Sequence, residues 1–328
     1  MTKRVLVTGG TGFTGGHLCR RLVAEGYQVR ALVRKSSRYH NLETLGVELV
    51  IGDLEDPSSL EPAVAEVETV YHLAALFRPE NVTRQDFLNT NVEGTRHLIE
   101  ASIKAGVHRF VHCSTVGVHG DIKEPPATEK TPYAPGDDYQ DSKTEGEKVV
   151  LQYMDEGKLS VVIFRPGGIF GPGDLRFLKL FRAIKKRRFL MLGSGEVLYQ
   201  LIYIDDLIEG ILRCGTYDKA SGKIYILTGV KPITLNHFVQ EIADVVEAPF
   251  PKLRLPVMPV YWCGYICELI CKPFGINPPI YRRRVDFFRK TRSFDISKAQ
   301  EQLSFTPTTE FKKALKTTAD WYTQHDYM

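Results

Sequence analysis

The chain has 328 residues, of which 43% are hydrophobic and 25% are charged, and its formal net charge is only +4. This length can bury a substantial core, in one large domain or in two joined ones, and the composition is ordinary for a globular protein. So balanced a charge argues against nucleic acid as the partner, and no apolar run reaches the ~20 residues of a membrane-spanning helix.

Six cysteines show no disulfide framework, and the chain enters a strand pattern at once, without a signal peptide; both features predict a cytoplasmic protein. Cys263, Cys267 and Cys271 recur every four residues. No histidine or carboxylate set joins them, so we interpret them as buried thiols on one helical face and expect no metal site. The basic clusters at 185–188 and 282–284 are interpreted as solvated faces, or as contacts for an anionic substrate or a membrane surface.

The first half of the chain alternates strand and helix patterns, which predicts an α/β fold with a doubly wound parallel sheet of the Rossmann type. Strands are predicted at 4–8, 28–33, 47–51, 68–73, 108–114, 159–164 and 223–228, and helices at 14–25, 58–65, 84–105 and 137–156. The second half is less regular. We expect a dinucleotide-binding domain of residues 1–165 plus about 197–228, and a smaller, discontinuous substrate domain of about 166–196 plus 229–328.

The strand at 4–8 leads into three glycines, Gly9, Gly12 and Gly15, and a helical pattern follows. Glycines let the backbone turn tightly and approach a pyrophosphate, while the start of the helix offers free N–H groups and the positive end of its dipole. This context predicts a dinucleotide site that also includes Phe13 and Thr14. The alternative is a strand-to-helix turn that binds no ligand.

The end of the second strand indicates which cofactor binds. An acid at this place accepts the ribose hydroxyls in NAD sites, whereas an arginine nearby accommodates a 2′-phosphate. Here Arg34 and Lys35 follow the strand and no acid is present, so we predict NADP with Arg34 as its phosphate contact, and NAD as the alternative. Asp53 follows the third strand and could accept from the adenine amino group. Ala74 and Ala75 are small residues where the backbone can pass close to the cofactor.

Tyr139 and Lys143 form the predicted catalytic pair. On a helix, positions i and i+4 share a face. A phenol has a pKa near 10, roughly, and is a poor base at neutral pH, but a neighbouring ammonium and a cationic nicotinamide lower that pKa. Tyr139 then becomes a usable proton donor or acceptor. Ser114 and Thr115 end an upstream strand and place hydroxyls in the order that such a site needs.

With these residues in view, the chain resembles an extended short-chain dehydrogenase/reductase over nearly its whole length. The three glycines match the nucleotide loop of that family, and Thr115, Tyr139 and Lys143 match its catalytic positions, with Ser114 as the weaker candidate for the hydroxyl. The resemblance implies further cofactor contacts at Asp53, Leu54, Leu73, Ala74, Ala75, Asn91 and Pro166.

The resemblance also implies roles. Tyr139 exchanges a proton with the substrate oxygen, Thr115 orients that oxygen, and Lys143 binds the nicotinamide ribose and lowers the pKa of Tyr139, while a hydride moves between nicotinamide and substrate carbon. The stretch 164–174 is closest in pattern to 3β-hydroxysteroid and sterol dehydrogenases and to dihydroflavonol reductases. Gly167 stands where sugar-nucleotide epimerases commonly carry an asparagine.

We therefore expect an NAD(P)-dependent oxidoreductase that interconverts a secondary alcohol and a ketone on a hydrophobic sterol-, isoprenoid- or flavonoid-like molecule. The alternatives are a sugar-nucleotide epimerase or dehydratase with tightly held NAD, and a catalytically silent cofactor sensor. Residues 255–275 are apolar nearly all round. They are interpreted as a helix over the core, a subunit contact, a lid, or a peripheral membrane contact. The helices at 84–105 and 137–156 resemble those that pair in family dimers, which implies a homodimer.

Overall fold

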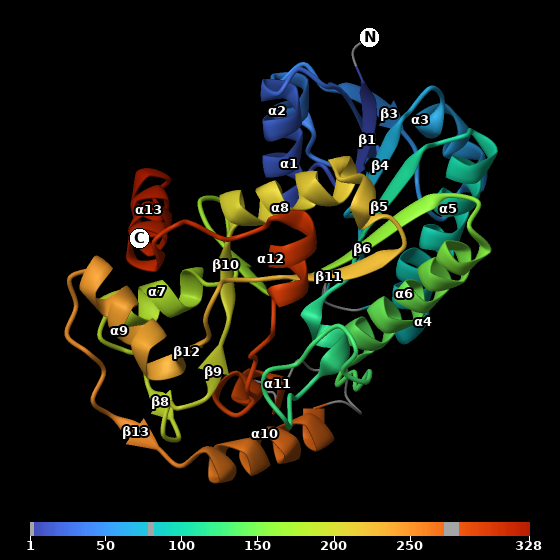
Figure 1. The fold of residues 1–328 in the computed structure, drawn as a ribbon. Helices are drawn as coiled ribbons and strands as arrows, with labels where there is room; N and C mark the ends of the chain where they lie inside the picture. Colours follow the sequence, from blue (N-terminus) through green and yellow to red (C-terminus); the bar gives the residue numbers. More distant parts are fainter. Residues whose placement is uncertain (1–2, 78–81, 272–281) are drawn as a thin grey trace.

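The computed structural model describes residues 3–77, 82–271 and 282–328 (Figure 1). Its centre is a seven-stranded sheet in the order β11-β6-β5-β4-β1-β2-β3. All neighbouring strands are parallel. The strands are β1 Arg4–Thr8, β2 Gln28–Val33, β3 Glu48–Ile51, β4 Thr69–His72, β5 Arg109–Cys113, β6 Ser160–Pro166 and β11 Lys223–Leu227. Each predicted strand is present, and the predicted doubly wound α/β sheet is confirmed.

The register of the strands brings their carboxyl ends to one edge of the sheet. Thr8 stands opposite Leu32 on one side and opposite His72 on the other, and Cys113 stands opposite Phe164. The strand order reverses between β1 and β4, because β2 and β3 follow on one side of β1 and the chain then crosses to β4 on its other side. In open parallel sheets, ligands bind in the crevice outside such a switch point.

Two helical layers cover the sheet, because strands buried on both faces need apolar cover on each side. One layer holds α1 Phe13–Ala24, α2 His40–Glu43, α8 Ile204–Thr216 and α12 Ser297–Leu303. The other holds α3 Glu61–Val64, α5 Gly94–Lys104 and α6 Asp138–Glu156. The helix predicted over 84–105 consists of α4 Arg84–Leu88, a π-helical turn Asn89–Glu93 and α5, and the one predicted over 58–65 of a 3-10 turn Pro57–Ser59 and α3.

A third core cluster lies beside the sheet and includes Phe170, Phe181, Phe238 and Tyr322. Helices α7 Leu178–Lys185, α9 Leu235–Val245 and α13 Phe311–Gln324 pack around it, whereas α10 Val257–Cys271 and α11 Arg282–Val285 contribute no described residue to it. Short strands pair as β7 Gly168–Phe170 with β10 Leu201–Tyr203, β9 Leu198–Tyr199 with β12 Ile233–Thr234, and β8 Met191–Leu192 with β13 Arg254–Leu255. Further 3-10 turns are Val116–His119, Asp218–Ala220 and Asp286–Phe288.

The predicted division into two domains stays a prediction. The prediction assigns residues 229–328 to the substrate domain. Three of them, Ala299, Leu303 and Phe305, pack in the core on one face of the central sheet.

Helix α10 lies along one edge of the molecule, at the bottom of Figure 1, and only Gly264 of its residues is buried. The interpretation of its cysteines as buried thiols is therefore wrong: Cys263 is exposed, and Cys267 and Cys271 are half-buried. The interpretation of 255–275 as a helix over the core is also wrong for the part through Cys271, because this part stands on the surface; residues 272–275 lie outside the described residues. Within the described ranges, no helix has the length and apolar character needed to cross a membrane.

Candidate active site

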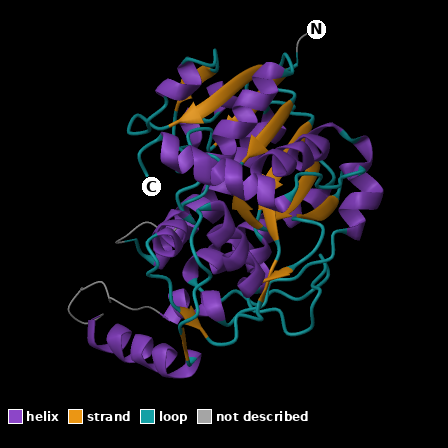
Figure 2. Cartoon of the chain, turned by 90° about the vertical axis from the view of Figure 1, so that its left-hand side faces the viewer, coloured by secondary structure: helices purple, strands orange, loops and turns teal. Residues whose placement is uncertain are grey.

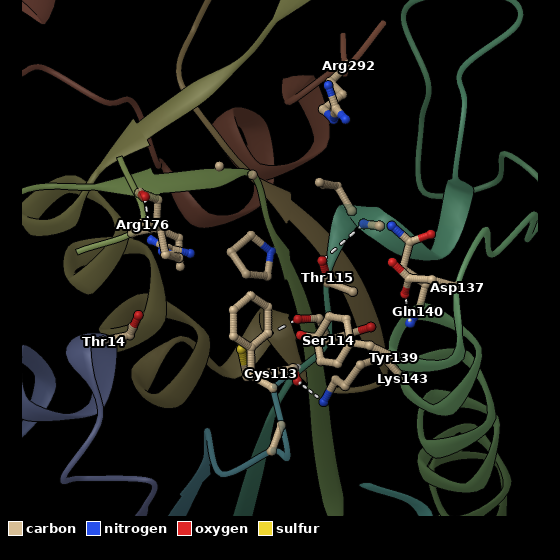
Figure 3. A pocket seen from close by; sticks show the side chains of 18 of the residues that line it. Thr14, Cys113, Ser114, Thr115, Asp137, Tyr139, Gln140, Lys143, Arg176 and Arg292 are labelled. Atoms are coloured by element: carbon tan, nitrogen blue, oxygen red, sulfur yellow. Dashed lines mark hydrogen bonds between the residues drawn. The ribbon is translucent and has the colours of Figure 1, made fainter. Parts of the chain in front are cut away.

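A cleft of about 1150 Å³ opens at the carboxyl edge of the sheet (Figure 3). The turn after β1, the ends of β4, β5 and β6 and the start of α6 form its inner wall. Its outer part is formed by residues 173–176, which precede α7, and by residues of α10 and of the segment 282–294. The predicted residues that line it are Gly9, Gly12, Phe13, Thr14, Gly15, Leu73, Ala75, Thr115, Tyr139, Lys143 and Pro166.

The glycine turn has room for backbone only. Gly9 has a φ of +74°, and a Cβ there would lie 2.8 Å from the Ala74 nitrogen. A Cβ on Gly15 would collide with the carbonyl oxygen of Gly9. Helix α1 begins after Gly12, and no side chain caps it, whereas the Asp137 side chain caps α6 by accepting from the Gln140 N–H. An uncapped helix start facing a cleft fits the pyrophosphate of a dinucleotide.

The segment after β4 is held against this turn. The Thr8 hydroxyl bonds the His72 Nδ1 at 2.8 Å and accepts from the Ala74 N–H at 3.2 Å. Leu73 and Ala75 consequently face the cleft, while Ala74 lies behind them against Gly9. The segment after β4 thus passes close to the glycine turn, and its passage close to the cofactor stays a prediction.

Asn91 lies in the π-helical turn, is buried, and does not line the cleft. Its Nδ2 donates to the Ser142 hydroxyl at 2.9 Å, and its Oδ1 accepts from the Leu76 N–H at 2.7 Å. A Cβ on Gly146 would collide with the Asn91 carbonyl oxygen, so this glycine admits the turn next to α6. Asn91 therefore ties the segment after β4 to the helix that carries Tyr139 and Lys143.

Tyr139 and Lys143 share one face of α6 and both line the cleft (Figure 3). The Tyr139 ring makes edge contacts with Phe77 and Phe87, at centroid distances of 4.9 and 6.3 Å. The Lys143 ammonium donates to the Cys113 carbonyl at 2.7 Å. Its side chain is buried, and burial lowers the pKa of Lys143.

The two hydroxyls after β5 have different surroundings. Thr115 is half-buried and lines the cleft, and its Oγ1 accepts from the Gly117 N–H at 3.0 Å. Ser114 also reaches the cleft wall, but its hydroxyl donates to the carboxylate of Glu147 and is buried. Thr115 thus retains a donor for a ligand, whereas the Ser114 donor is used inside the protein.

A buried ion pair stands behind this wall, and the sequence reasoning missed it. Arg165 in β6 binds Glu147 in α6, and both side chains are almost fully buried. The Tyr133 hydroxyl donates to Glu147 at 2.9 Å, and Arg165 also contacts His119 Nε2 at 3.0 Å. Burial by itself raises the pKa of Glu147. The hydrogen bonds and charge of Arg165 and the hydroxyls of Ser114 and Tyr133 have the larger, opposite effect, so the pKa of Glu147 is lowered. The available signal was spacing, since Glu147 follows Lys143 by one helical turn.

Besides Ala74 and Asn91, three more predicted cofactor residues stand outside the cleft wall. Arg34 is exposed directly after β2. Asp53 follows β3, and its Oδ1 accepts from the Glu55 N–H at 3.2 Å. Leu54 is buried next to Gly94. A Cβ added to Gly94 would lie 2.8 Å from the Cβ of Leu54. Arg34 directly follows the end of β2, and Asp53 and Leu54 follow the end of β3.

The outer part of the cleft carries cations that the sequence reasoning did not assign. Arg176 pairs with Asp174 at 2.6 Å, Arg282 with Glu268 at 2.8 Å and Lys290 with Asp286 at 2.8 Å. Arg292 stacks on the Tyr199 ring at 4.9 Å and donates to the Lys290 carbonyl. Among the residues that the structure describes, no carboxylate forms an ion pair with Arg292, which lines the cleft (Figure 3).

Gly167 lines the cleft beside Pro166. A Cβ there would collide with the Thr228 hydroxyl and lie 2.8 Å from the Gln200 carbonyl oxygen. No larger residue fits this backbone, so the cleft wall is bare main chain at this point.

Comparisons with known proteins agree with this geometry. The model of the NAD dependent epimerase/dehydratase family matches residues 5–227. A putative dihydroflavonol 4-reductase of Synechocystis sp. is 30% identical, over 98% of this chain and 95% of its own. The 3beta-hydroxysteroid-dehydrogenase/decarboxylase isoform 1 of Arabidopsis thaliana is 30% identical, over 96% of this chain and 78% of its own.

The crystal structure of gox2253 superposes with a TM-score of 0.85 at 29% identity, over the full length of both chains. The glycine turn, the parallel sheet and these matches lead to one conclusion. The chain belongs to the NAD dependent epimerase/dehydratase family, the extended short-chain dehydrogenases/reductases, and is an NAD(P)-dependent enzyme.

Proposed function

We propose that this enzyme interconverts a secondary alcohol and a ketone on a lipophilic substrate, with Tyr139 as the acid/base. The observation that carries the proposal is the common wall of the cleft: Thr115, Tyr139 and Lys143 line it together with the glycine turn. The nicotinamide, when bound, supplies or accepts the hydride.

The contacts within the cleft support one role for each of these residues. In oxidation Tyr139 takes the hydroxyl proton of the substrate, and in reduction it returns the proton to the oxygen. Thr115 donates a hydrogen bond to the same oxygen. The Lys143 ammonium, one helical turn from Tyr139, favours the phenolate form that accepts the proton.

For the cofactor, Gly9, Gly12 and Gly15 would hold the pyrophosphate, and Lys143 the nicotinamide ribose. Arg34 is exposed after β2 in a stretch without acids, so we favour NADP, with Arg34 at the 2′-phosphate. Fluorescence titration tests this preference: Arg34→Ala weakens NADP binding and leaves NAD binding unchanged. Equal affinities of the unaltered enzyme for NAD and NADP would contradict it.

Aromatic side chains support a lipophilic substrate. Phe77, Tyr261, Phe287 and Phe294 line the cleft around and beyond Tyr139. Apolar rings of this size recognise a flat or extended hydrocarbon skeleton through area burial.

A sugar-nucleotide epimerase or dehydratase is the second candidate. Arg292 favours it, because a cation that no carboxylate of the described residues pairs with suits a diphosphate. The bare main chain at Gly167 disfavours it. The two candidates differ in cofactor use, since an epimerase regains its cofactor in each cycle. Stoichiometric NAD in the purified protein supports the epimerase, and exchangeable cofactor supports the dehydrogenase.

Tyr139→Phe tests the central proposal. We expect cofactor affinity to stay within about twofold and turnover to fall by about 10²–10⁴-fold, the usual contribution of a general acid/base. Phe87→Leu, which alters a neighbour of the same ring, is the matched control and should retain most turnover. Unchanged turnover in Tyr139→Phe, under conditions where cofactor still binds, would refute the assignment.

A further inference from the structure

We propose that the exposed face of α10 docks on an anionic phospholipid bilayer, with the helix lying in the plane of the headgroups. This inference goes beyond the proposed reaction and does not require it. Figure 1 places α10 along the edge of the molecule, and in Figure 2 the same helix, followed by a grey trace, projects at the lower left.

One face of α10 is apolar and open to solvent. Met258, Trp262, Ile266 and Ile270 recur every four residues and Leu269 lies among them, with 46–60% of each residue exposed. Leu255, just before the helix, is 41% exposed, and Leu253 is 67% exposed. Most large exposed apolar residues of the described chain thus gather in this one short segment, which marks an interaction site rather than ordinary surface.

The opposite face of α10 carries the polar groups and is turned inward. Tyr261 and Glu268 line the cleft. Arg289 stacks on Tyr261 at 4.2 Å, and Arg282 stacks on Tyr265 at 4.7 Å and pairs with Glu268. A surface helix in water has the reverse arrangement, with its polar side outward. The outward apolar side therefore favours an apolar environment that the described residues do not supply.

Charge identifies the partner. Lys252 and Arg254 are the charged exposed residues between 252 and 271, and the single acid of that stretch, Glu268, is half-buried and paired with Arg282. The exposed basic run 185–188 lies close to this segment. It ends three residues before Met191, and the Met191 N–H donates to the Leu253 carbonyl. Cations around an apolar face suit anionic headgroups above acyl chains.

A second copy of this chain suits the surface less well. Two copies that meet through α10 would bring the positive charges of both copies together around the contact, and their repulsion opposes association. The helix has 15 residues, about 22 Å at 1.5 Å per residue, so it lies on a bilayer rather than crossing it. Trp262 belongs to the residue type that prefers the boundary between headgroups and hydrocarbon.

The test uses the two tryptophans of the chain, Trp262 and Trp321. In the full-length variant Trp321→Phe, the emission reports Trp262 alone. We expect a blue shift and co-sedimentation with vesicles of phosphatidylcholine containing phosphatidylglycerol, and much weaker binding to phosphatidylcholine alone or at high salt.

In the otherwise unaltered chain, Ile266→Glu should weaken partitioning by about tenfold or more, because one buried apolar side chain is lost and an anion is added. Val230→Glu, at an apolar residue that is 44% exposed outside this segment, is the matched control and should bind as before. Lys186→Glu should weaken binding to anionic vesicles only. Binding that Ile266→Glu leaves intact would overturn the proposal. Absent binding, together with a dimer that Ile266→Glu dissociates, would assign the face to a second copy.

Tyr139→Phe separates this proposal from the proposed function. Vesicle binding should be the same in this variant as in the active enzyme. An active enzyme that ignores vesicles refutes only the docking surface, and a vesicle-bound protein in which Tyr139→Phe keeps full turnover refutes only the reaction.

Discussion

Lys143 holds a positive charge where the protein disfavours it. Its side chain is buried, its ammonium bonds the Cys113 carbonyl, and the carboxylate of Glu147 lies further along the same helix face. Burial is the largest effect and lowers the pKa of Lys143. A buried cation next to a phenol is the condition under which a tyrosine acts as a base.

This pKa predicts an alkaline limit to activity. As the pH rises, Lys143 loses its proton at a lower pH than a free lysine does, and Tyr139 then loses its electrostatic support. We expect kcat/KM to fall on the alkaline side through the pKa of Lys143. Lys143→Arg keeps its charge and should move this limb to higher pH, whereas Lys143→Met should be slow throughout. The same alkaline limb in Lys143→Arg would contradict the assignment.

At the scale of elements, the site depends on close approaches between backbones. The turn from β1 to α1 passes against the segment after β4, and the π-helical turn passes against α6. Glycines at both contacts, Gly9 and Gly146, have no room for a Cβ. These contacts place the start of α1, the segment after β4 and helix α6 around one cleft.

Gly15→Ala tests the turn, because the new Cβ would collide with the Gly9 carbonyl oxygen and displace the loop. We expect cofactor affinity to fall by about 100-fold or more, as measured by fluorescence titration. Gly16→Ala is a matched control in the same helix, where a Cβ lies 3.4 Å from the nearest atom, the Gly10 carbonyl oxygen. Similar losses in both variants would mean that alanine acts through the helix rather than through the turn.

The Glu147–Arg165 pair joins α6 to β6 and also holds Ser114. Glu147→Gln leaves a buried guanidinium without its counter-charge, so we expect a loss of about 3–5 kcal/mol in the free energy of unfolding by urea. The double variant Glu147→Leu/Arg165→Met, which removes both charges, should be more stable than Glu147→Gln. The reverse order would show that the pair contributes little as a pair.

The same carboxylate gives this effect a pH dependence. The pKa of Glu147 is lower in the folded protein than in the unfolded chain. Its stabilisation is therefore complete above the unfolded pKa and is lost as the pH falls through the folded pKa. The stability difference between the unaltered protein and Glu147→Gln should shrink in acid.

At the scale of the whole molecule, the sheet supplies the cofactor side of the cleft and the irregular second half supplies the outer side. The family resemblance implies a homodimer through the helices α4, α5 and α6, which cover residues 84–104 and 138–156. We expect sedimentation without lipid to give twice the chain mass of 37.1 kDa. Trp262→Glu should leave that mass unchanged. If Trp262→Glu gave a monomer, the dimer contact would lie at α10 and not at α4, α5 and α6.

Much of the fold was predictable because its signals are local. Each buried parallel strand is a short apolar run, and each predicted helix has its own periodicity. The segmentation of 84–105 was not predictable, since Asn91 in the π-helical turn bonds Leu76 and Ser142, which lie near it only in the folded chain. The Glu147–Arg165 pair was missed for a similar reason, because its partners come from a helix and a strand that meet only after folding.

The sequence by itself determined the parallel sheet, the family and most of the predicted residues that line the inner wall of the cleft. Glycine spacing, strand ends and the Tyr139–Lys143 interval are local patterns that the backbone must obey. Only the tertiary structure decided which hydroxyl faces the cleft, where Arg292 lies, and that α10 turns its polar side inward. These outcomes depend on contacts between distant segments, which no local pattern encodes.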